Sequence, residues 1–257
     1  MKKNLPDSII ELMTKLQFAS YIDHTLLAPN ATVKQIVQLC QEAKRFSFAS
    51  VCVNPVYVAL AAGELAGSSV NVCTVIGFPL GASTTASKVF EAVDAIKNGA
   101  VEIDMVMDIG AAKDGRFSEL GADIAAVVQA CKEEGKKEGK KIIVKVILET
   151  CLIDDKEVVS ACLCAKNAGA DFVKTSTGFA NPKSLDGNAL PNGASEHHVK
   201  LMRETVGPEM GVKASGGIRS VRSAITMLEA GASRIGTSSG VTLIESWDES
   251  AEIKAKY

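Results

Sequence analysis

Apolar and polar residues alternate along this chain with two periods, one typical of strands and the other of helices. Short β-branched and apolar runs predict strands at 25–28, 49–54, 70–77, 102–107, 142–148, 172–176, 212–215 and 234–236. Apolar residues at helical spacing predict helices between them, including 32–46, 84–98, 117–132, 154–167 and 221–230. About eight strand and helix pairs in about 250 residues favour a single (β/α)8 TIM barrel of the α/β class.

The alternation runs almost from end to end, so we expect one barrel domain over residues 1–257. An extra N-terminal helix is expected within 1–20, and a C-terminal helix and tail within 241–257. The polar run KEEGKKEGKK at 132–141 is too short to separate two domains and is interpreted as a solvated helix end and loop. A doubly wound open sheet is the alternative architecture. It is disfavoured because no GxGxxG follows the first strand and because polar residues occur inside at least four strands.

The composition of the chain argues against some classes of binding partner. The formal net charge is -2, so no broad positive field would attract nucleic acid or an anionic membrane. Polar residues interrupt the apolar ones in 1–18, which indicates an amphipathic helix and not a secretion signal, and no apolar stretch reaches the roughly 18 residues of a membrane span. The seven cysteines include no CxxC pair, which favours reduced thiols. We therefore expect a cytoplasmic protein with a small-molecule partner.

Polar residues at alternate strand positions indicate what the barrel interior holds. In the strand at 102–107 the apolar residues share one parity, and Asp104 has the other. The same alternation assigns side chains of four further strands to the interior: Cys52, Lys145, Lys174 and Lys213. Three successive strands therefore direct a lysine toward the barrel axis.

Lysine is seldom fully buried, because an unpaired ammonium is costly to desolvate. One inward lysine could extend to the barrel end or pair with a carboxylate, but three together are harder to explain in this way. With Asp104 as the one evident acid at their depth, we expect crowding to lower the pKa of one lysine toward neutrality. A neutral amine attacks carbonyls and forms an iminium, which is an electron sink for an adjacent carbon–carbon bond. The residues alone do not decide which lysine is the nucleophile.

Glycine and hydroxyl residues cluster after the late strands, in TSTGF at 175–179, ASGGI at 214–218 and GTSSG at 236–240. Ordinary turn chemistry explains any one of these clusters. In barrels, however, the loops after the seventh and eighth strands commonly hold a phosphate through backbone N–H groups. We therefore expect a phosphate site at the last two clusters.

Potential metal ligands are few, and the histidines are His24, His197 and His198. The last two are adjacent in a helical pattern, so we expect them to point in different directions, to face solvent and not to share an ion. We predict no metal and no cofactor. Asp23 and Thr25 share a parity and are candidates for the interior, whereas His24 is equally explained as a turn or cap residue.

The motifs of the chain, taken in order, resemble those of the deoxyribose-phosphate aldolases, a class I aldolase family. The matching segments are DHTLL, SVCVNP, VIGFPLG, EIDMVMD, KVILET, DFVKTSTGF, VKASGGIR and RIGTSSG. Each segment alone is modest evidence, and the ordered set is specific. The resemblance implies reversible cleavage of 2-deoxy-D-ribose 5-phosphate to D-glyceraldehyde 3-phosphate and acetaldehyde, through a lysine Schiff base and enamine, in deoxyribonucleoside breakdown.

The resemblance also implies roles for individual residues. Lys174, in DFVKTSTG, would form the Schiff base, and Lys213, in VKASGG, would keep it unprotonated. Asp104, in EIDMV, would act with water as general acid and base. Lys145 becomes a supporting residue near Asp104, and Cys52 lines the acetaldehyde pocket without a required role.

Other implied roles are less specific. Asp23 and Thr25 would lie near the sugar hydroxyls, and longer family members have a terminal tyrosine that reaches the active site, for which Tyr257 is the candidate. An idle, frayed tail is the alternative for Tyr257. Family members are dimers or larger assemblies, and we expect a homo-oligomer with a dimer favoured. The residues implied around the phosphate are Gly178, Gly216, Gly217, Gly236, Ser238 and Ser239.

Three other functions are compatible with a phosphate-binding barrel. A transaldolase-like enzyme or a fructose-bisphosphate aldolase would differ in the strand that carries its lysine and in the size of its pocket. A non-catalytic sugar-phosphate sensor would not require three inward lysines and an aspartate. A proton-transfer isomerase needs a carboxylate base and no covalent lysine. The motifs favour the deoxyribose-phosphate aldolases over all three.

Overall fold

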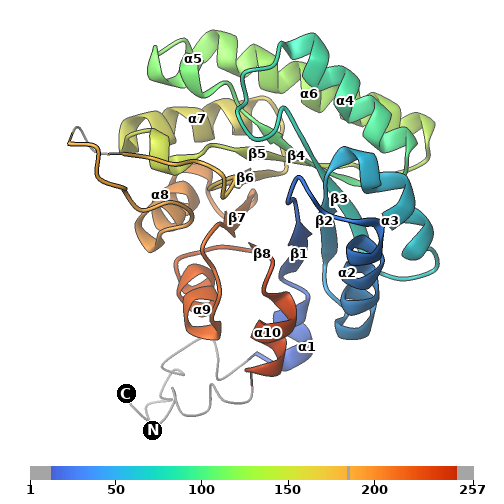
Figure 1. Cartoon of the computed structure of the whole chain (residues 1–257). Helices are drawn as coiled ribbons and strands as arrows, with labels where there is room; N and C mark the ends of the chain where they lie inside the picture. The colour runs from blue at the N-terminus through green and yellow to red at the C-terminus, as the bar shows by residue number, and fades with distance from the viewer. Residues whose placement is uncertain (1–12, 184–185, 248–257) are drawn as a thin grey trace, which may run out of the picture.

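The described part of the chain forms a closed barrel of eight parallel strands (Figure 1). It comprises residues 13–183 and 186–247 of a computed structural model. Each strand pairs with the next one in the sequence, and β8 pairs with β1, which closes the barrel. The predicted (β/α)8 fold is therefore confirmed. The strands are β1 (Ile22–Leu26), β2 (Ser50–Val53), β3 (Asn71–Ile76), β4 (Glu102–Val106), β5 (Ile143–Ile147), β6 (Phe172–Lys174), β7 (Gly211–Ser215) and β8 (Arg234–Thr237).

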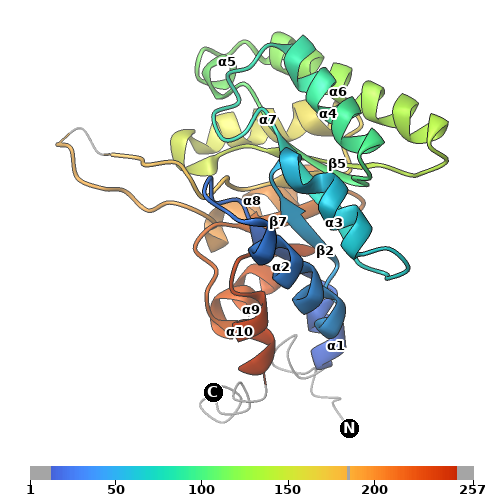
Figure 2. The ribbon, with the colours of Figure 1, turned by 45° about the vertical axis from the view of Figure 1, so that its right-hand side comes forward.

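Helices connect the strands and cover the outside of the barrel (Figures 1 and 2). The five helices with predicted starts begin within one residue of them, and side-chain caps explain four of these starts, at α2, α4, α7 and α9. Thr32, for example, accepts a hydrogen bond from the backbone N–H of Gln35 at the start of α2, and Asp154 caps α7 in the same way. The helices are α1 (Lys15–Ala19), α2 (Val33–Phe46), η2 (Pro55–Tyr57), α3 (Val58–Glu64), α4 (Thr85–Lys97), α5 (Ile109–Lys113), α6 (Phe117–Lys137), η3 (Thr150–Leu152), α7 (Asp155–Asn167), α8 (Glu196–Val206), α9 (Val221–Glu229) and α10 (Gly240–Glu245).

The strands separate an apolar outer layer from a polar interior. Apolar residues of β4 such as Ile103 are fully buried in the main hydrophobic core, and Asp104 has the opposite orientation. The strand register pairs Asp104 with Lys145 across β4 and β5, and Lys174 with Lys213 across β6 and β7. Four of the side chains predicted to face inward therefore occupy neighbouring positions on four adjacent strands.

Two element boundaries differ from the prediction by three residues or more. β1 begins at Ile22, before the predicted start at 25. The polar residues Asp23 and His24 resemble a turn in the sequence, but both are buried because each hydrogen-bonds to another side chain. α6 continues to Lys137, past the predicted end at 132, so the first six residues of the run at 132–141 are helical. Glu134 is buried within it and forms an ion pair with Lys137.

The segments at the two ends of the described chain pack together. α1 and α10 lie side by side, and the rings of Phe18 and Trp247 stack with their centroids 4.3 Å apart (Figures 1 and 2). The segments 1–20 and 241–257, which were expected to be helical, contain these two helices in their described parts. Tyr257 lies outside the described residues. Among residues 13–183 and 186–247, no helix combines the length and the apolar character needed to cross a membrane.

Candidate active site

Asp104 lies at the centre of a buried group of charges inside the barrel. Its Oδ1 accepts a hydrogen bond from Lys145 Nζ at 2.8 Å, and its Oδ2 accepts from Lys174 Nζ at 2.8 Å and Lys213 Nζ at 2.7 Å. The four residues come from β4, β5, β6 and β7, and none is more than 3% exposed. The structure therefore brings together the charged side chains that the strand alternation assigned to the interior.

Two further carboxylates belong to this group: Asp23, which was a candidate for the interior, and Glu102, which has the same parity as Asp104 in β4. Asp23 Oδ2 lies 2.5 Å from Lys213 Nζ, and Glu102 Oε2 lies 2.5 Å from Lys145 Nζ. Arg234 Nη1 contacts both acids, at 2.6 Å from Asp23 and 3.4 Å from Glu102. The expectation that one acid serves the three lysines is therefore wrong. Four cationic side chains face three carboxylates, because strands β1 and β8 contribute charges as well.

These carboxylates set the pKa values of the interior groups. Burial lowers the pKa of Lys213, but Asp104 and Asp23 outweigh it and raise that pKa above its ordinary value. At Lys145, burial also lowers the pKa and Asp104 raises it, and the result is again a raised pKa. Burial raises the pKa of Asp104, but the lysines hold it well below its ordinary range. The expected lowering of a lysine pKa therefore does not occur at Lys145 or Lys213, which are held as ammonium groups.

Lys174 differs from the other two lysines in its contacts and its access. Lys145 and Lys213 each lie close to two carboxylates of other strands, Glu102 or Asp23 in addition to Asp104. Within the described part of the chain, the one ion pair of Lys174 is with Asp104. An open cavity lies at the carboxyl ends of the strands, and Lys174 is the one lysine of the described residues that lines it. A nucleophilic amine needs access to the carbonyl and freedom to leave its ion pairs, and Lys174 has one such pair in the described structure, whereas the other two lysines have two or more. The geometry therefore distinguishes Lys174 where the residue pattern did not.

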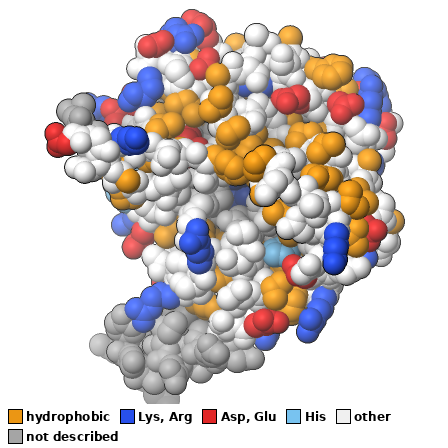
Figure 3. Space-filling view, viewed as in Figure 1, with side chains coloured by type: hydrophobic (Ala, Val, Ile, Leu, Met, Phe, Trp, Pro, Cys, Tyr) orange, Lys and Arg blue, Asp and Glu red, His pale blue; other side chains and the backbone are white. Residues whose placement is uncertain are grey.

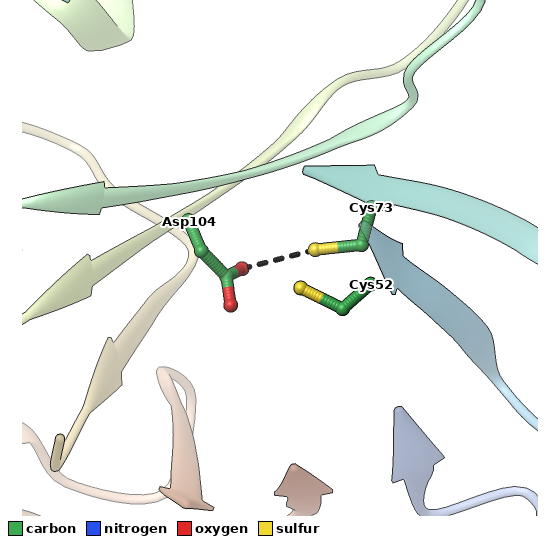
Figure 4. Close-up of side chains that lie close together, drawn as sticks. All are labelled: Cys52, Cys73 and Asp104. Carbon is green, nitrogen blue, oxygen red and sulfur yellow. Dashed lines mark hydrogen bonds between the residues drawn. The ribbon is translucent and has the colours of Figure 1, made fainter. Parts of the chain in front are cut away.

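Two thiols form an apolar wall beside Asp104. Cys52 of β2 and Cys73 of β3 are register partners, and both point toward Asp104 (Figure 4). Cys73 Sγ donates a hydrogen bond to Asp104 Oδ1 at 3.3 Å, and burial raises the pKa of the Cys73 thiol well above its ordinary value. Cys52 is fully buried, so it lies in the interior as predicted, but it does not line the open cavity beside Lys174, where the resemblance would place it. The buried members of this small cluster, which is separate from the main core, are Leu27, Cys52, Cys73 and Val75.

A cavity of about 470 Å³ opens next to Lys174, at the carboxyl ends of β1, β6, β7 and β8. Phe179 lines it and packs edge to face against Phe78, with ring centroids 5.2 Å apart. Hydrophobic side chains gather on the upper half of the face shown in Figure 3. Active sites of barrel enzymes lie at this end, so the cavity is the candidate substrate site. The predicted residues that line it are Thr25, Lys174, Gly178, Gly216, Gly217, Gly236 and Ser238.

Close backbone contacts require glycine in the loops around the cavity. Gly216 has a φ of 89°, and a Cβ placed there would lie 2.8 Å from the Cα of Gly193. Gly193 has a φ of 98°, and a Cβ there would lie 2.4 Å from the carbonyl oxygen of Gly216. The Ala194 N–H donates a hydrogen bond to that oxygen at 3.1 Å. The loops after β6 and β7 therefore pack backbone against backbone beside the cavity.

Glu149 holds the loop after β6, a role that sequence reasoning missed. It is 1% exposed and has a φ of 56°, in the left-handed region that favours glycine. Its carboxylate accepts hydrogen bonds from the backbone N–H of Thr177 at 3.2 Å and from the Thr177 hydroxyl. The KVILET segment contains Glu149, but no local pattern in a sequence shows a contact between two loops.

Some residues occupy places other than the predicted ones. Asp23 is fully buried and does not line the cavity, where the resemblance implied a contact with the sugar hydroxyls. It belongs instead to the buried group of charges around Asp104. Ser239 adjoins the cavity at the start of α10 without lining it. Tyr257 lies outside the described residues. Arg219, at the end of the VKASGGIR segment, lines the cavity, and its position in that segment was a signal that we did not use.

We expect the interior carboxylates to make the free energy of unfolding depend on pH in the acid range. The pKa values of Asp23 and Asp104 are lowered, mainly by the lysines that overcome the effect of burial. A lowered folded-state pKa stabilises the protein fully above the unfolded value of about 3.9, and this stabilisation is lost as pH falls through the folded-state pKa. Urea unfolding should therefore show little change between about pH 7 and 5 and a loss of stability below about pH 4. Asp23→Asn should lower stability at neutral pH and reduce the acid slope, and an unchanged slope would contradict the assignment.

Two groups of potential metal ligands lie among the described residues: Cys52, Cys73 and Asp104, and Asp155, His197 and His198. In the first group, Lys145 already bonds to two of the members, and its ammonium would repel a metal cation. In the second group, the expectation that the two histidines point in different directions is wrong. His197 Nε2 and His198 Nε2 lie 2.9 Å and 3.7 Å from oxygens of Asp155, and His198 is only partly exposed.

The chain is similar to known aldolases over most of its length. A protein named deoxyribose-phosphate aldolase from Geobacillus sp. (strain WCH70) is 55% identical over 227 residues, which cover 88% of this chain and 94% of that protein. Deoxyribose-phosphate aldolase 1 of Staphylococcus aureus (strain Mu50 / ATCC 700699) is 54% identical over 230 residues, which cover 90% of this chain and 96% of that protein.

Solved structures and family comparison agree with these similarities. The structure described as a unique tetrameric deoxyribose phosphate aldolase from Aeropyrum pernix superposes with a TM-score of 0.80 at 36% identity, covering 91% of this chain and 92% of that one. The family described as DeoC/LacD family aldolase matches residues 18–244, which include every strand of the barrel. This chain therefore belongs to the DeoC/LacD family of aldolases.

Proposed function

We propose that this chain is a class I 2-deoxy-D-ribose-5-phosphate aldolase that forms its Schiff base at Lys174. The observation that carries the proposal is the position of Lys174, whose Nζ lies 2.8 Å from Asp104 and faces a cavity with glycine-rich walls. The similar proteins from Geobacillus and Staphylococcus aureus are named deoxyribose-phosphate aldolases, which supports this substrate. The reaction is the reversible cleavage of the sugar phosphate to D-glyceraldehyde 3-phosphate and acetaldehyde, without a metal or cofactor.

The covalent steps need an amine next to a proton acceptor. Asp104, acting through water, takes the proton that Lys174 loses, and the amine then attacks C1 of the open-chain sugar. The carbinolamine loses water to give an iminium, which accepts the electron pair of the C2–C3 bond as that bond breaks. The C3 hydroxyl gives its proton to the water that acts with Asp104, and its carbon becomes the aldehyde of glyceraldehyde 3-phosphate. The remaining enamine takes up a proton at its terminal carbon, and hydrolysis releases acetaldehyde and restores Lys174.

The other two lysines supply fixed positive charge in this proposal. Lys213 Nζ shares Asp104 Oδ2 with Lys174, and two carboxylates hold Lys213 in its ammonium form. A permanent like charge at this position disfavours a second one on the nucleophile, which is the role implied for Lys213. Lys145 acts on the other oxygen of Asp104 and keeps the carboxylate oriented. Cys52 needs no chemical role, since it forms part of the apolar wall.

The substrate phosphate is proposed to bind at the loops after β6, β7 and β8. Backbone N–H groups in glycine-rich turns bind phosphate well, and the positive φ values of Gly216 and Gly217 belong to such a turn. Arg219 adds a cationic side chain to the same wall. Thr25, on the strand β1 that pairs with β8, is proposed to contact a sugar hydroxyl. The proposed phosphate residues are Gly178, Gly216, Gly217, Gly236, Ser238 and Ser239.

Arg219→Ala should raise KM for 2-deoxyribose 5-phosphate by about ten- to a hundredfold, the value of a charge-assisted hydrogen bond to phosphate. The kcat should change less, because Arg219 is remote from the bond that breaks. The KM for 2-deoxyribose, which lacks the phosphate, should stay the same. Steady-state kinetics with both sugars measure this difference, and Arg222→Ala is the matched control because Arg222 does not line the cavity. An equal rise in KM for 2-deoxyribose 5-phosphate and for 2-deoxyribose would contradict a contact between Arg219 and the phosphate.

The proposed function is tested by incubating the purified chain with 2-deoxyribose 5-phosphate and measuring both products with coupled dehydrogenases. Acetaldehyde and glyceraldehyde 3-phosphate should form in equal amounts. Conversion of the sugar phosphate without acetaldehyde would indicate an isomerase. Binding without turnover would indicate a sensor, and turnover of a different phosphosugar alone would indicate another aldolase.

We also propose that the chain forms a homo-oligomer, with a dimer favoured. The relative from Aeropyrum pernix is described as tetrameric, and large hydrophobic side chains such as Val56, Leu80 and Phe90 are exposed on this chain. Light scattering coupled to size exclusion should give a mass of twice 27.0 kDa. A mass of 27.0 kDa at micromolar concentration would contradict this expectation. A cytoplasmic location stays a prediction from the sequence.

A further inference from the structure

We propose that Asp155, His197 and His198 form a binding site for one divalent transition-metal ion at the rim of the barrel. His197 Nε2 lies 2.9 Å from each oxygen of the Asp155 carboxylate, and His198 Nε2 lies 3.7 Å from Oδ1. The ligand atoms of the three residues all lie within 4.8 Å of one another. The site is separate from the interior charge group and does not depend on the proposed reaction.

The local structure holds the three ligands near one another. Asp155 is the first residue of α7, and the two histidines are in the first turn of α8, so the site lies between the starts of two helices that pack together. Ser195 fixes the second helix start, because its hydroxyl accepts the backbone N–H of His198 at 3.1 Å. The side chains of His197 and Asp155 are 64% and 57% exposed, so an ion can reach them from solvent.

The ligand types fit a borderline divalent ion such as Zn²⁺ or Co²⁺. Imidazole nitrogen and carboxylate oxygen bind Zn²⁺ at about 2.0–2.2 Å, which corresponds to ligand atoms roughly 3.2–3.6 Å apart in a tetrahedral site. The contact of His197 with Asp155 is already close to this spacing, and small side-chain rotations bring His198 into it. Three protein ligands leave one position for water. A metal-free hydrogen bond between His197 and Asp155 is the competing explanation for the cluster.

The charges near the cluster do not oppose a cation. The starts of two helices carry partial positive charge, but acidic side chains lie in the same turns and offset it. Asp154 caps α7, Glu157 follows in its first turn, and Glu196 opens α8. Two basic side chains offset part of this acidity: Lys113, which pairs with Glu157 at 2.9 Å, and Lys156, which is exposed in the first turn of α7. The first turns therefore retain acidic side chains beside the proposed ion.

The site is tested on the full chain by titration with Co²⁺, followed by the visible spectrum, and with Zn²⁺, followed by calorimetry. One ion per chain should bind with a dissociation constant in the micromolar range, without the charge-transfer band that cysteine ligands give to Co²⁺. His198→Ala and Asp155→Asn should each weaken binding by at least about tenfold. Glu204→Gln is the matched control, because it removes one exposed negative charge from α8 outside the first turn and should leave binding unchanged.

Thermal unfolding of each variant shows whether it folds, and all three should melt close to the unaltered protein in the absence of metal, because the changed side chains lie on the surface. Three outcomes would overturn the proposal. The first is the absence of saturable binding of either ion. The second is unchanged affinity in His198→Ala and Asp155→Asn. The third is a thiolate charge-transfer band, which would assign the bound ion to cysteine.

Discussion

Lys174→Ala should lower kcat/KM for cleavage of 2-deoxyribose 5-phosphate by at least about ten-thousandfold, because no iminium forms without the amine. The fold should remain intact, because Asp104 keeps its hydrogen bonds to Lys145 and Lys213 when this third partner is removed. A coupled assay for acetaldehyde measures the loss of activity, and thermal unfolding followed by circular dichroism measures the fold.

Lys174→Arg is the matched control for charge. The guanidinium keeps a cation next to Asp104 but does not form an imine under these conditions, so this variant should be as inactive as the alanine variant. Substantial turnover by the arginine variant would show that Lys174 acts only as a positive charge. That result would contradict a covalent mechanism at this residue.

Asp104→Asn should lower both activity and stability. The carboxylate is the common acceptor for three buried ammonium groups, and its loss leaves Lys174 without a carboxylate partner in the described part of the chain and the other two lysines with fewer. Breaking buried ion pairs from one side costs about 3–5 kcal/mol of unfolding free energy. Loss of the proposed general acid and base should lower kcat by about a hundred- to ten-thousandfold. Urea unfolding and steady-state kinetics measure the two effects.

Asp123→Asn separates these two effects. Asp123 of α6 forms a buried ion pair with Lys88 of α4, at 2.7 Å, outside the barrel interior. Its removal should lower stability while leaving the kcat of the folded fraction close to that of the unaltered protein. An equal fall in kcat for the Asp104 and Asp123 variants would show that instability alone explains the loss, and a near-normal kcat for Asp104→Asn would contradict its proposed role.

The strand alternation predicted the barrel and its charged interior because a period of two determines which side of a strand each residue occupies. Asp104, Lys145, Lys174 and Lys213 were assigned to the interior on this ground, and all four meet there. The parity of a residue does not depend on where its strand begins or ends. The predicted start of β1 was three residues too late, but the parity of Asp23 was unchanged.

Contacts between strands could not be predicted in this way. The pairing of Asp23 with Lys213 and of Glu102 with Lys145 depends on the register around a closed barrel, which no single strand encodes. Because these pairs were not predicted, the lysines were expected to have too few carboxylate partners and a lowered pKa. The pKa values of Lys145 and Lys213 are instead raised.

Contacts between helices and between loops are even harder to predict from the local sequence. His197 and His198 approach one carboxylate because α7 and α8 begin side by side, although adjacent residues on one helix point about 100° apart around its axis. Glu149 reaches Thr177 across two loops that are far apart in the sequence. The distinction between Lys174 and the other lysines likewise required the cavity and the complete set of ion pairs.

The Schiff base at Lys174 is tested most directly by mixing the protein with acetaldehyde and sodium borohydride, then measuring the intact mass and mapping the peptides. Borohydride reduces an imine to a stable secondary amine, so a trapped acetaldehyde remains as an ethyl group. We expect one ethyl group per chain, on the peptide that contains Lys174, and none in Lys174→Arg. An unmodified protein, or an ethyl group on Lys145 or Lys213 in place of Lys174, would contradict the account.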